Sequence, residues 1–188
     1  MLGRPLHSPK AFAATNLYDW TKLEDIDRLG GYYSDTARSA NGSHLLLSVA
    51  QGGQGTGVES PLYVSSDYGV SWQNVAGLAD EGVRNNWESV DVSNDGQIMV
   101  ASSNDGYNID TDSDATAKLV KSEDGGTTWE NITPDGSDDW RKVVVSGDGN
   151  TIAAIRSNSG EVFISENGGS SWAGSSFGVW IMFAMFAK

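Results

Sequence analysis

The fold is decided by one short stretch of sequence, Ser122-Glu123-Asp124-Gly125-Gly126-Thr127-Thr128-Trp129. An Asp followed by two glycines predicts a tight turn, because Gly tolerates positive φ and an Asp side chain accepts hydrogen bonds from turn N–H groups. The Trp that ends the stretch is large enough to cover a hairpin end and to pack against a neighbouring sheet. The stretch therefore predicts a turn between two strands, stabilised by its own side chains.

The same pattern occurs three times, which makes it a structural repeat. We interpret the positions that recur in all three copies as structural rather than ligand-binding, because the turn itself uses their polar groups. The pattern is Ser-x-Asp/Asn-x-Gly-x-Ser/Thr-Trp, and it is carried by Ser65, Asp67, Gly69 and Trp72, by Ser122, Asp124, Gly126 and Trp129, and by Ser165, Asn167, Gly169 and Trp172.

A second motif lies between these copies and ends in a hairpin signal. Trp87 and Trp140 each begin a Trp-x-x-Val-x-Val segment, which is followed by Ser93-Asn94-Asp95-Gly96 or by Ser146-Gly147-Asp148-Gly149. A weaker copy has Tyr33 and then Ser39-Ala40-Asn41-Gly42. The runs at 45–50, 98–101 and 152–155 are apolar at successive positions, as expected of a strand between two sheets. We expect Trp87 and Trp140 to pack between those sheets.

Together the motifs predict an all-β protein, a β-propeller-like array of four-stranded antiparallel blades, with about three full blades plus partial blades at both ends. In the middle copy we expect strands at 87–93, 97–102, 118–122 and 127–132. We divide the chain into an N-terminal extension at 1–16, propeller blades at 17–176 and an apolar tail at 177–188. The tail is the first strand of a further blade, a patch for a partner, or the end of a truncated gene. It is shorter than the roughly 20 residues of a membrane-spanning helix, so we expect no membrane span.

The repeated turn resembles the Asp-box, or bacterial neuraminidase repeat. Over Tyr33 to Trp172 the chain resembles the blades of Asp-box propellers, such as sialidases, xyloglucan-type glucanases, sortilin-type receptors and the photosystem II assembly-factor group. The resemblance implies that ligands meet the face formed by the loops between second and third strands. It also implies an extracellular or secreted protein, although residues 1–14 lack the apolar segment of a signal peptide. It is specific for fold and not for function, because one fold hosts many activities.

Two of the loops between second and third strands, 51–61 and 103–117, are long enough to carry a site. In the second loop we take Asp105, Tyr107 and Asn108 as candidate ligand-binding residues. The same loop places carboxylates at alternate positions, and their oxygens suit calcium, which is the one candidate cofactor. A solvated acidic loop is the alternative, because no EF-hand pattern is present. The candidate calcium ligands are Asp110, Asp112 and Asp114.

Composition narrows the classes of function. The formal net charge of −13 argues against a nucleic-acid partner, because phosphate binding needs a Lys/Arg surface. The absence of Cys excludes disulfides and thiolate chemistry. His7 and His44 are the two histidines, and their positions do not predict a shared metal site.

Three functions are therefore candidates. The sequence does not decide whether the protein is an enzyme, although it favours a non-catalytic one. The first is a non-catalytic binding or scaffold module that takes a glycan or a protein on the loop face. The second is a fragment of an Asp-box glycoside hydrolase, sialidase-like or glucanase-like; the Arg-Ile-Pro motif of sialidases is absent, because Gly3-Arg4-Pro5 does not match it. The third is an assembly factor. Since about three blades fall short of a closed ring of four to eight, we expect either a homo-oligomer or the remainder of a larger propeller.

Overall fold

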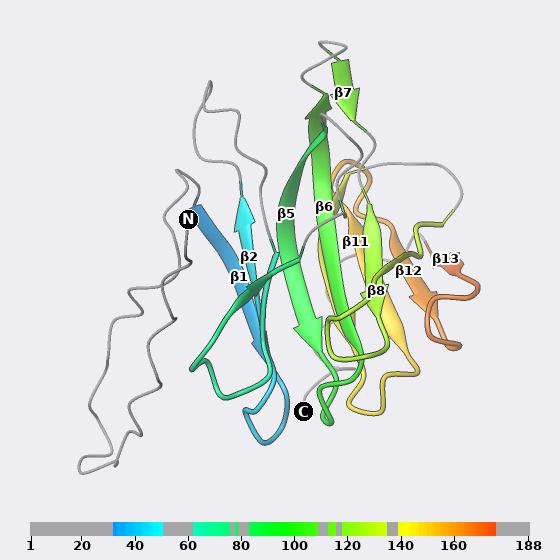
Figure 1. The fold of residues 1–188 in the computed structure, drawn as a ribbon. Coiled ribbons are helices and arrows are strands. Elements are labelled where there is room, and N and C mark those ends of the chain that lie inside the picture. The colour runs from blue at the N-terminus through cyan, green and yellow to red at the C-terminus, as the bar shows by residue number, and fades with distance from the viewer. Residues whose placement is uncertain are drawn as a thin grey trace.

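The structure is a computed structural model that describes residues 32–50, 62–75, 78, 83–108, 113–115, 118–134 and 139–175. These residues form antiparallel strands and no helix (Figure 1). The N-terminal extension, the partial blades expected at both ends, the apolar tail and the loop at 51–61 lie outside the described residues. No helix in the described part of the chain is long and apolar enough to cross a membrane.

The strands form three sheets that follow one another along the chain. The first sheet has the order β1 (Tyr32–Arg38), β2 (Leu45–Ala50), β3 (Leu62–Ser65) and β4 (Gln73–Asn74). The second has β5 (Val83–Val92), β6 (Met99–Asn108), β8 (Leu119–Ser122) and β9 (Glu130–Asn131), with β7 (Ser113–Ala115) paired to β6. The third has β10 (Trp140–Val145), β11 (Ile152–Arg156), β12 (Val162–Ser165) and β13 (Ala173–Ser175). This architecture confirms the prediction of four-stranded antiparallel propeller blades.

Each sheet begins with the same hairpin. The backbone N–H of the hairpin serine donates to the carbonyl oxygen five residues later, at 2.9 Å for Ser39 and 2.8 Å for both Ser93 and Ser146. The glycine in the turn has a φ of 76° to 82°, a region in which side-chain-bearing residues are strained. The Asn-Gly and Asp-Gly signals of the sequence therefore mark the turns between the first and second strands.

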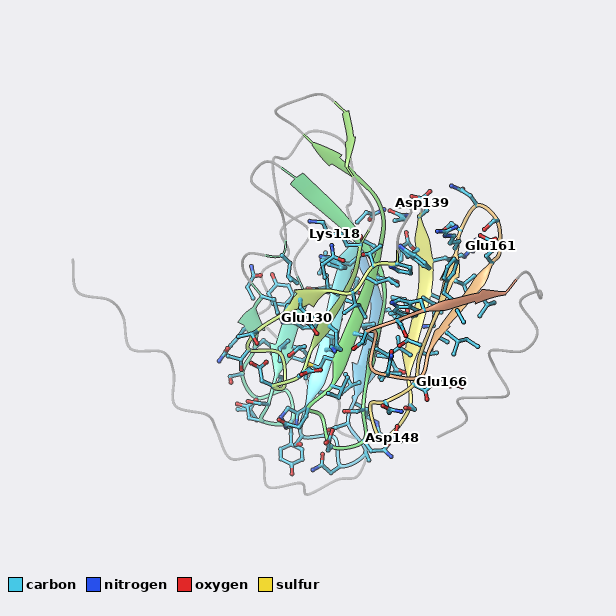
Figure 2. The ribbon with its side chains drawn as sticks, turned by 90° about the vertical axis from the view of Figure 1, so that its right-hand side faces the viewer. Lys118, Glu130, Asp139, Asp148, Glu161 and Glu166 are labelled. Atoms are coloured by element: carbon cyan, nitrogen blue, oxygen red, sulfur yellow. The ribbon has the colours of Figure 1, made fainter. Side chains whose placement is uncertain are left out.

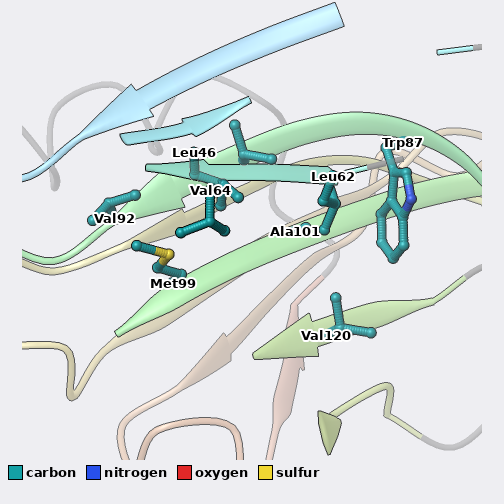
Figure 3. Packing of buried hydrophobic residues seen from close by; sticks show 9 residues of the cluster. Leu46, Leu62, Val64, Trp87, Val92, Met99, Ala101 and Val120 are labelled. Atoms are coloured by element: carbon teal, nitrogen blue, oxygen red, sulfur yellow. The ribbon is translucent and has the colours of Figure 1, made fainter. Parts of the chain in front are cut away.

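The core lies between the sheets, because each second strand is apolar on both of its faces. In β6, Met99 and Ala101 belong to the cluster shared with the first sheet (Figure 3). Val100, which points the other way, belongs to the cluster shared with the third sheet. Trp87 and Trp140 are 1% and 0% exposed and occupy these two clusters, which confirms the expectation that they pack between sheets. Burying such aromatic side chains dominates the energetics of a core.

The second sheet differs from the prediction at one end. Asp105, Tyr107 and Asn108, expected in a loop, lie in β6, which continues through residues 103–108. The continuation pairs with β5 on one side, through Val83↔Asn108, and with β7 on the other, through Tyr107↔Asp114. Polar, Gly-containing sequence favours a loop, and the pairing of this stretch with β5 and β7 overrides that preference. We call residues 83–86, 104–108 and 113–115 the arm; it extends beyond the other sheets (Figure 1).

Candidate binding face

The two ends of the sheets carry different groups. At one end of the third sheet lie Asp139 and Glu161, and at the other lie Asp148 and Glu166 (Figure 2). The first end also carries the connections between second and third strands and the base of the arm, and we call it the loop face. The second end carries the hairpin turns and the Asp-box turns, and we call it the turn face.

On the turn face, the polar groups of each Asp-box turn bond to one another. In the first copy, Ser65 Oγ donates to Asp67 Oδ1 at 2.8 Å and accepts from the Gly69 N–H at 2.9 Å. Asp67 Oδ1 also accepts from the Ser71 N–H at 2.8 Å, and its Oδ2 accepts from the Ser71 hydroxyl at 2.6 Å. The second copy repeats the set with Ser122 and Asp124. The third repeats the bonds of Ser165 and of the Ser171 N–H, but Asn167 Nδ2 donates to the Ser171 hydroxyl instead of accepting from it. Both side-chain oxygens of each Asp are thus engaged within the turn.

These bonds favour the charged form of the two aspartates. Hydrogen bonds from the Thr128 N–H and hydroxyl, with a further one from Ser122, lower the pKa of Asp124 to about 2. The corresponding bonds from Ser71 lower the pKa of Asp67. An aspartate whose pKa is lowered in this way is a poor proton donor near neutral pH.

The Asp-box tryptophans attach the turns to the sheets. Trp72 Nε1 donates to the Gly69 carbonyl at 3.1 Å, and Trp129 Nε1 donates to the Gly126 carbonyl at 3.0 Å. Trp172 differs, because its Nε1 donates to the Ile132 carbonyl of the preceding sheet at 2.9 Å. Unlike Trp87 and Trp140, these three side chains are partly exposed.

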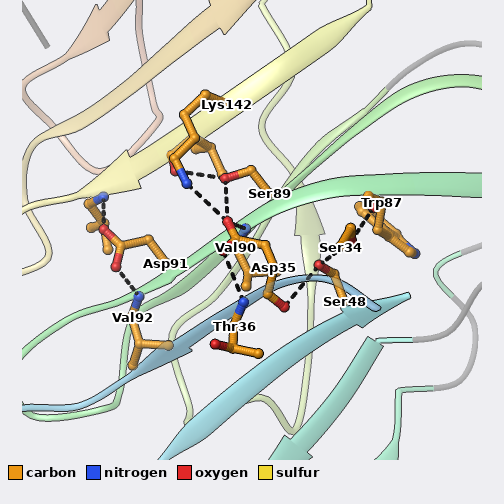
Figure 4. Close-up of polar contacts among 12 residues, drawn as sticks. Ser34, Asp35, Thr36, Ser48, Trp87, Ser89, Val90, Asp91, Val92 and Lys142 are labelled. Carbon is orange, nitrogen blue, oxygen red and sulfur yellow. Dashed lines mark hydrogen bonds and ion pairs between the residues drawn. The ribbon is translucent and has the colours of Figure 1, made fainter. Parts of the chain in front are cut away.

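A polar cluster of three residues joins the first strands of all three sheets. Asp35 Oδ2 on β1 accepts from Ser89 Oγ on β5 at 3.0 Å and pairs with Lys142 Nζ on β10 at 2.9 Å (Figure 4). The same oxygen accepts from the Val90 N–H at 3.2 Å. We call Asp35, Ser89 and Lys142 the inner-strand cluster. The side chains of Asp35 and Lys142 are 26% and 43% exposed, so both charges are partly accessible to solvent.

The repeat places these three residues at one structural position. They are separated by 54 and 53 positions, as are the hairpin serines. The sequence alone does not reveal the cluster, because its three side chains have unlike chemistry and no shared residue type marks the position. The signal that could have revealed it is the repeat spacing, applied to the first strand of each copy.

A polar path runs from the inner strands to the arm. Asn104 Nδ2 donates to Glu88 Oε1, and Asn86 Nδ2 donates to Asn104 Oδ1, both at 2.6 Å. On β1, Ser34 Oγ donates to the Trp87 carbonyl at 2.6 Å. These side chains are only partly buried or are exposed, so the path presents polar groups, bonded to one another, at the base of the arm.

A second polar group on the loop face belongs to the third sheet. The Arg156 guanidinium lies 4.5 Å from the Phe163 ring centroid and 5.5 Å from that of Trp140, which are cation–π distances. Its Nη1 pairs with Glu161 Oε2 at 3.0 Å. A tight turn at 157–160 follows Arg156 and takes the place that the arm has in the second sheet.

The structure leaves the predicted calcium site untested. Asp110 and Asp112 lie outside the described residues, and Asp114 is placed in β7 by its backbone pairing with Tyr107. Among the described side chains, no three of His, Asp and Glu come together in a group able to hold a metal ion. Calcium binding by Asp110, Asp112 and Asp114 therefore stays a prediction.

The sheets and their order define blades of a β-propeller, and comparison with solved structures agrees. The chain is similar to "YCF48 bound to D1 peptide", with 17% identity, a TM-score of 0.52, and coverage of 77% of this chain and 40% of that one. It is similar to YCF48 from Cyanidioschyzon merolae, with 21% identity, a TM-score of 0.55 and the same coverage. It is also similar to the GH74 xyloglucanase from Xanthomonas campestris, with 22% identity, a TM-score of 0.50, and coverage of 76% and 21%.

These similarities show the fold alone, and the chain spans less than half the length of each of these proteins. No protein-family model matches the chain, and no curated protein sequence matches it. The function is therefore argued from the chain's own residues.

Proposed function

We propose that the chain is a non-catalytic binding module of the Asp-box propeller type, and that its ligand is a protein segment held on the loop face. The observation that carries the proposal is the arm, which projects from the loop face beside a partly exposed row of donors and acceptors. Such a row suits an extended peptide, because a peptide backbone alternates donor and acceptor groups. In this proposal Asp105, Tyr107 and Asn108 contribute from the arm, and the Asp-box residues keep a structural role.

Charge supports a protein ligand over a nucleic acid. The chain carries a net charge of −13, whereas the inner-strand cluster offers one carboxylate and one ammonium group in contact. Mixed charge of this kind favours specific orientation of a polar ligand, and an acidic surface attracts basic segments. YCF48 bound to D1 peptide is a solved example of a similar fold with a peptide partner, which is support by analogy of fold.

Two other functions are kept as candidates. A GH74 xyloglucanase is among the similar folds, so a glycan ligand or a glucanase fragment remains the first alternative. An assembly factor is the second, and it would use the same protein-binding face.

The test removes the β6 and β7 parts of the arm, residues 104–117, while keeping the blade. In the third sheet the Arg156 N–H donates to the Glu161 carbonyl across a four-residue turn, and Ser103 and Lys118 make the same bond at the base of the arm. Replacing residues 104–117 by the chain's own turn, Ser157-Asn158-Ser159-Gly160, therefore closes the second blade with a connection that the fold already uses. Arg156 and Glu161 provide the matching anchor geometry.

The assay is selection of a displayed random-peptide library on the parent chain, followed by affinity measurement on both chains. We expect selected peptides to lose roughly tenfold or more in affinity for the arm-replaced chain, with its circular dichroism unchanged. Equal affinity for both chains would overturn the assignment to the arm. Failure to select peptides, together with binding on a glycan array or hydrolysis of xyloglucan, would overturn protein binding in favour of the first alternative.

A further inference from the structure

The arm leaves the second sheet through a short segment of ladder that lies between two irregularities. The register of β5 and β6 shifts on both sides of the pairs Asn86↔Asn104 and Trp87↔Ser103. We call these two pairs the neck. A register shift bends a strand and increases its local twist, so two shifts this close together allow the neck to decide the direction of the arm.

One of the two shifts belongs to every sheet, and the other accompanies the arm. The shift that follows Trp87 recurs after Tyr33 in the first sheet and after Trp140 in the third. The shift between Arg84 and Asn86 has no counterpart among the described pairings of the first and third sheets. It occurs where β5 continues into the arm, which extends beyond the other sheets (Figure 1).

The lower end of the neck is fixed by the core. The Trp87 side chain is 1% exposed and belongs to the cluster between the first and second sheets. Its carbonyl oxygen also accepts from Ser34 Oγ of the first sheet at 2.6 Å. The backbone of β5 is therefore held at Trp87 on both counts, and any freedom of the arm begins above it.

Three polar side chains bond to one another across the neck. Asn104 Nδ2 donates to Glu88 Oε1, and Asn104 Oδ1 accepts from Asn86 Nδ2, both at 2.6 Å. We call Asn86, Glu88 and Asn104 the neck cluster. Asn104 uses both ends of its amide, so one side chain of β6 is joined to β5 on either side of Trp87. The bond to the carboxylate is charge-assisted, which makes it the stronger of the two.

The position of Glu88 is a product of the common register shift. Trp87 pairs with Ser103 and Ser89 pairs with Ser102, so Glu88 is the extra residue that the ladder leaves out. Ser34 and Arg141 occupy this position in the other two copies, at spacings of 54 and 53 residues. A carboxylate at the extra position is therefore particular to the sheet that carries the arm.

We propose that Asn104 is a positioning residue of the binding face, which fixes the direction of the arm by joining Glu88 to Asn86. The inference rests on the function proposed above and names the contact that regulates it. An arm whose direction is fixed beforehand binds a protein segment with a smaller loss of conformational entropy than an arm that must be ordered on binding. Asn104 therefore acts on affinity through the arm and needs no contact with the ligand.

The first test is amide hydrogen exchange of the full chain without any ligand. Asn104→Asp removes the donor to Glu88 and places two carboxylates against each other. We expect exchange in the arm, at residues 104–108 and 113–115, to become faster by roughly tenfold or more, with residues 99–102 unchanged. Glu88→Gln keeps an acceptor for the Asn104 amide and should leave the exchange of the arm as it is.

The double variant Asn104→Asp/Glu88→Gln provides a rescue. The amide of the introduced glutamine can donate to the introduced carboxylate, so the contact is restored with its direction reversed. We expect exchange in the arm to return toward that of the parent chain. If Asn104→Asp does not fold, as judged by circular dichroism, Glu88→Ala removes the same contact without adding a charge and should speed exchange of the arm.

The third sheet offers a matched control. Asn158 Nδ2 donates to Asp139 Oδ2 at 3.3 Å, which is the same kind of contact on the same loop face. Asn158→Asp therefore creates a like pair of facing carboxylates in a sheet that has a tight turn in place of the arm. It should change neither the exchange of the arm nor the affinity for peptides.

The second test measures affinity for the peptides selected on the parent chain. Asn104→Asp should weaken binding by roughly fivefold or more, and the double variant should restore most of the loss. Unchanged exchange in the Asn104→Asp arm, or faster exchange that the double variant does not reverse, would overturn the positioning role.

Two outcomes separate this inference from the proposed function. If replacement of the arm abolishes peptide binding while Asn104→Asp, with a loosened arm, binds as the parent does, the positioning role fails and the proposed function stands. If neither change affects affinity, or if the library yields no peptide, the proposed function fails, and the inference about affinity fails with it.

Discussion

Asp124 shows how a single carboxylate can specify a turn. Its two oxygens accept from the Thr128 N–H at 2.8 Å, the Thr128 hydroxyl at 2.7 Å and the Ser122 hydroxyl at 2.8 Å. The third copy makes the same turn with Asn167, whose Oδ1 accepts from the Ser171 N–H at 2.9 Å. The turn therefore needs the acceptor oxygen, and the charge adds a dependence on pH.

This dependence can be measured with Asp124→Asn. The folded pKa of Asp124, about 2, is below the unfolded value of about 3.9, so its contribution to stability is present above about pH 4 and is lost as pH falls through 2. We expect parent and variant to melt at similar temperatures at pH 7, as the Asn167 turn implies. Between pH 4 and pH 2 the melting temperature of the variant should fall less than that of the parent. The melting temperatures are measured by circular dichroism, and an equal fall for parent and variant would contradict the prediction.

Substitutions at Tyr68 and at the equivalent position Gly125 should change stability in opposite directions. Tyr68→Gly should raise the free energy of unfolding by about 1 kcal/mol, because Gly adopts positive φ without strain and the exposed phenol contributes little burial within one chain. Gly125→Ala should lower it by a similar amount, since its φ is 67° and its Cβ would lie against His44. Urea unfolding at low protein concentration measures both. A less stable Tyr68→Gly chain would show that the phenol is packed within its own chain.

At the scale of the strand, local sequence predicts each element whose signal is local. The hairpins at Gly42, Gly96 and Gly149 follow from Asn-Gly and Asp-Gly pairs, because φ preference belongs to single residues. The extension of β6 through Asp105 and Tyr107 does not, because its partners in β5 and β7 compensate for a polar sequence that alone favours a loop. Strand length here is set by tertiary pairing.

The inner-strand cluster is testable as an element-to-element contact. Asp35→Ala removes the acceptor shared by β1, β5 and β10 and should lower the free energy of unfolding by roughly 1–2 kcal/mol, because Ser89 Oγ and the Val90 N–H lose a charged partner. Lys142→Ala should cost less, below about 1 kcal/mol, because its ammonium is more exposed.

The double variant separates the pair from its surroundings. If Asp35 and Lys142 interact, the cost of the double variant should differ from the sum of the single costs, as measured by denaturant titration. Strict additivity would mean that the ion pair contributes nothing and that the bonds from β5 carry the effect of Asp35.

At the scale of the whole molecule, sequence predicts the repeat better than the site. Strands that are apolar on both faces predict that sheets pack face to face, since each strand has two faces to bury. Trp87 and Trp140 lie between sheets, as that prediction requires. The contact between Asp35 and Lys142 spans 107 positions, and it exists because three first strands lie side by side. Only the arrangement of whole blades brings such residues together, so residue type alone could not reveal the cluster.

The stack predicts a gradient of protection in amide hydrogen exchange. The second sheet contributes to apolar clusters on both sides, through Met99 and Ala101 toward the first sheet and Val100 toward the third. In an array whose apolar contacts lie between neighbouring units, the unit with two neighbours opens least often. Amides of residues 99–102 should therefore exchange most slowly, and those of the equivalent strands β2 and β11 faster, when exchange is measured at low protein concentration. Gly96→Asn, which places a side chain against His44, should speed exchange in the first sheet more than in the third. Uniform protection across the three sheets would show instead that the blades unfold as one cooperative unit.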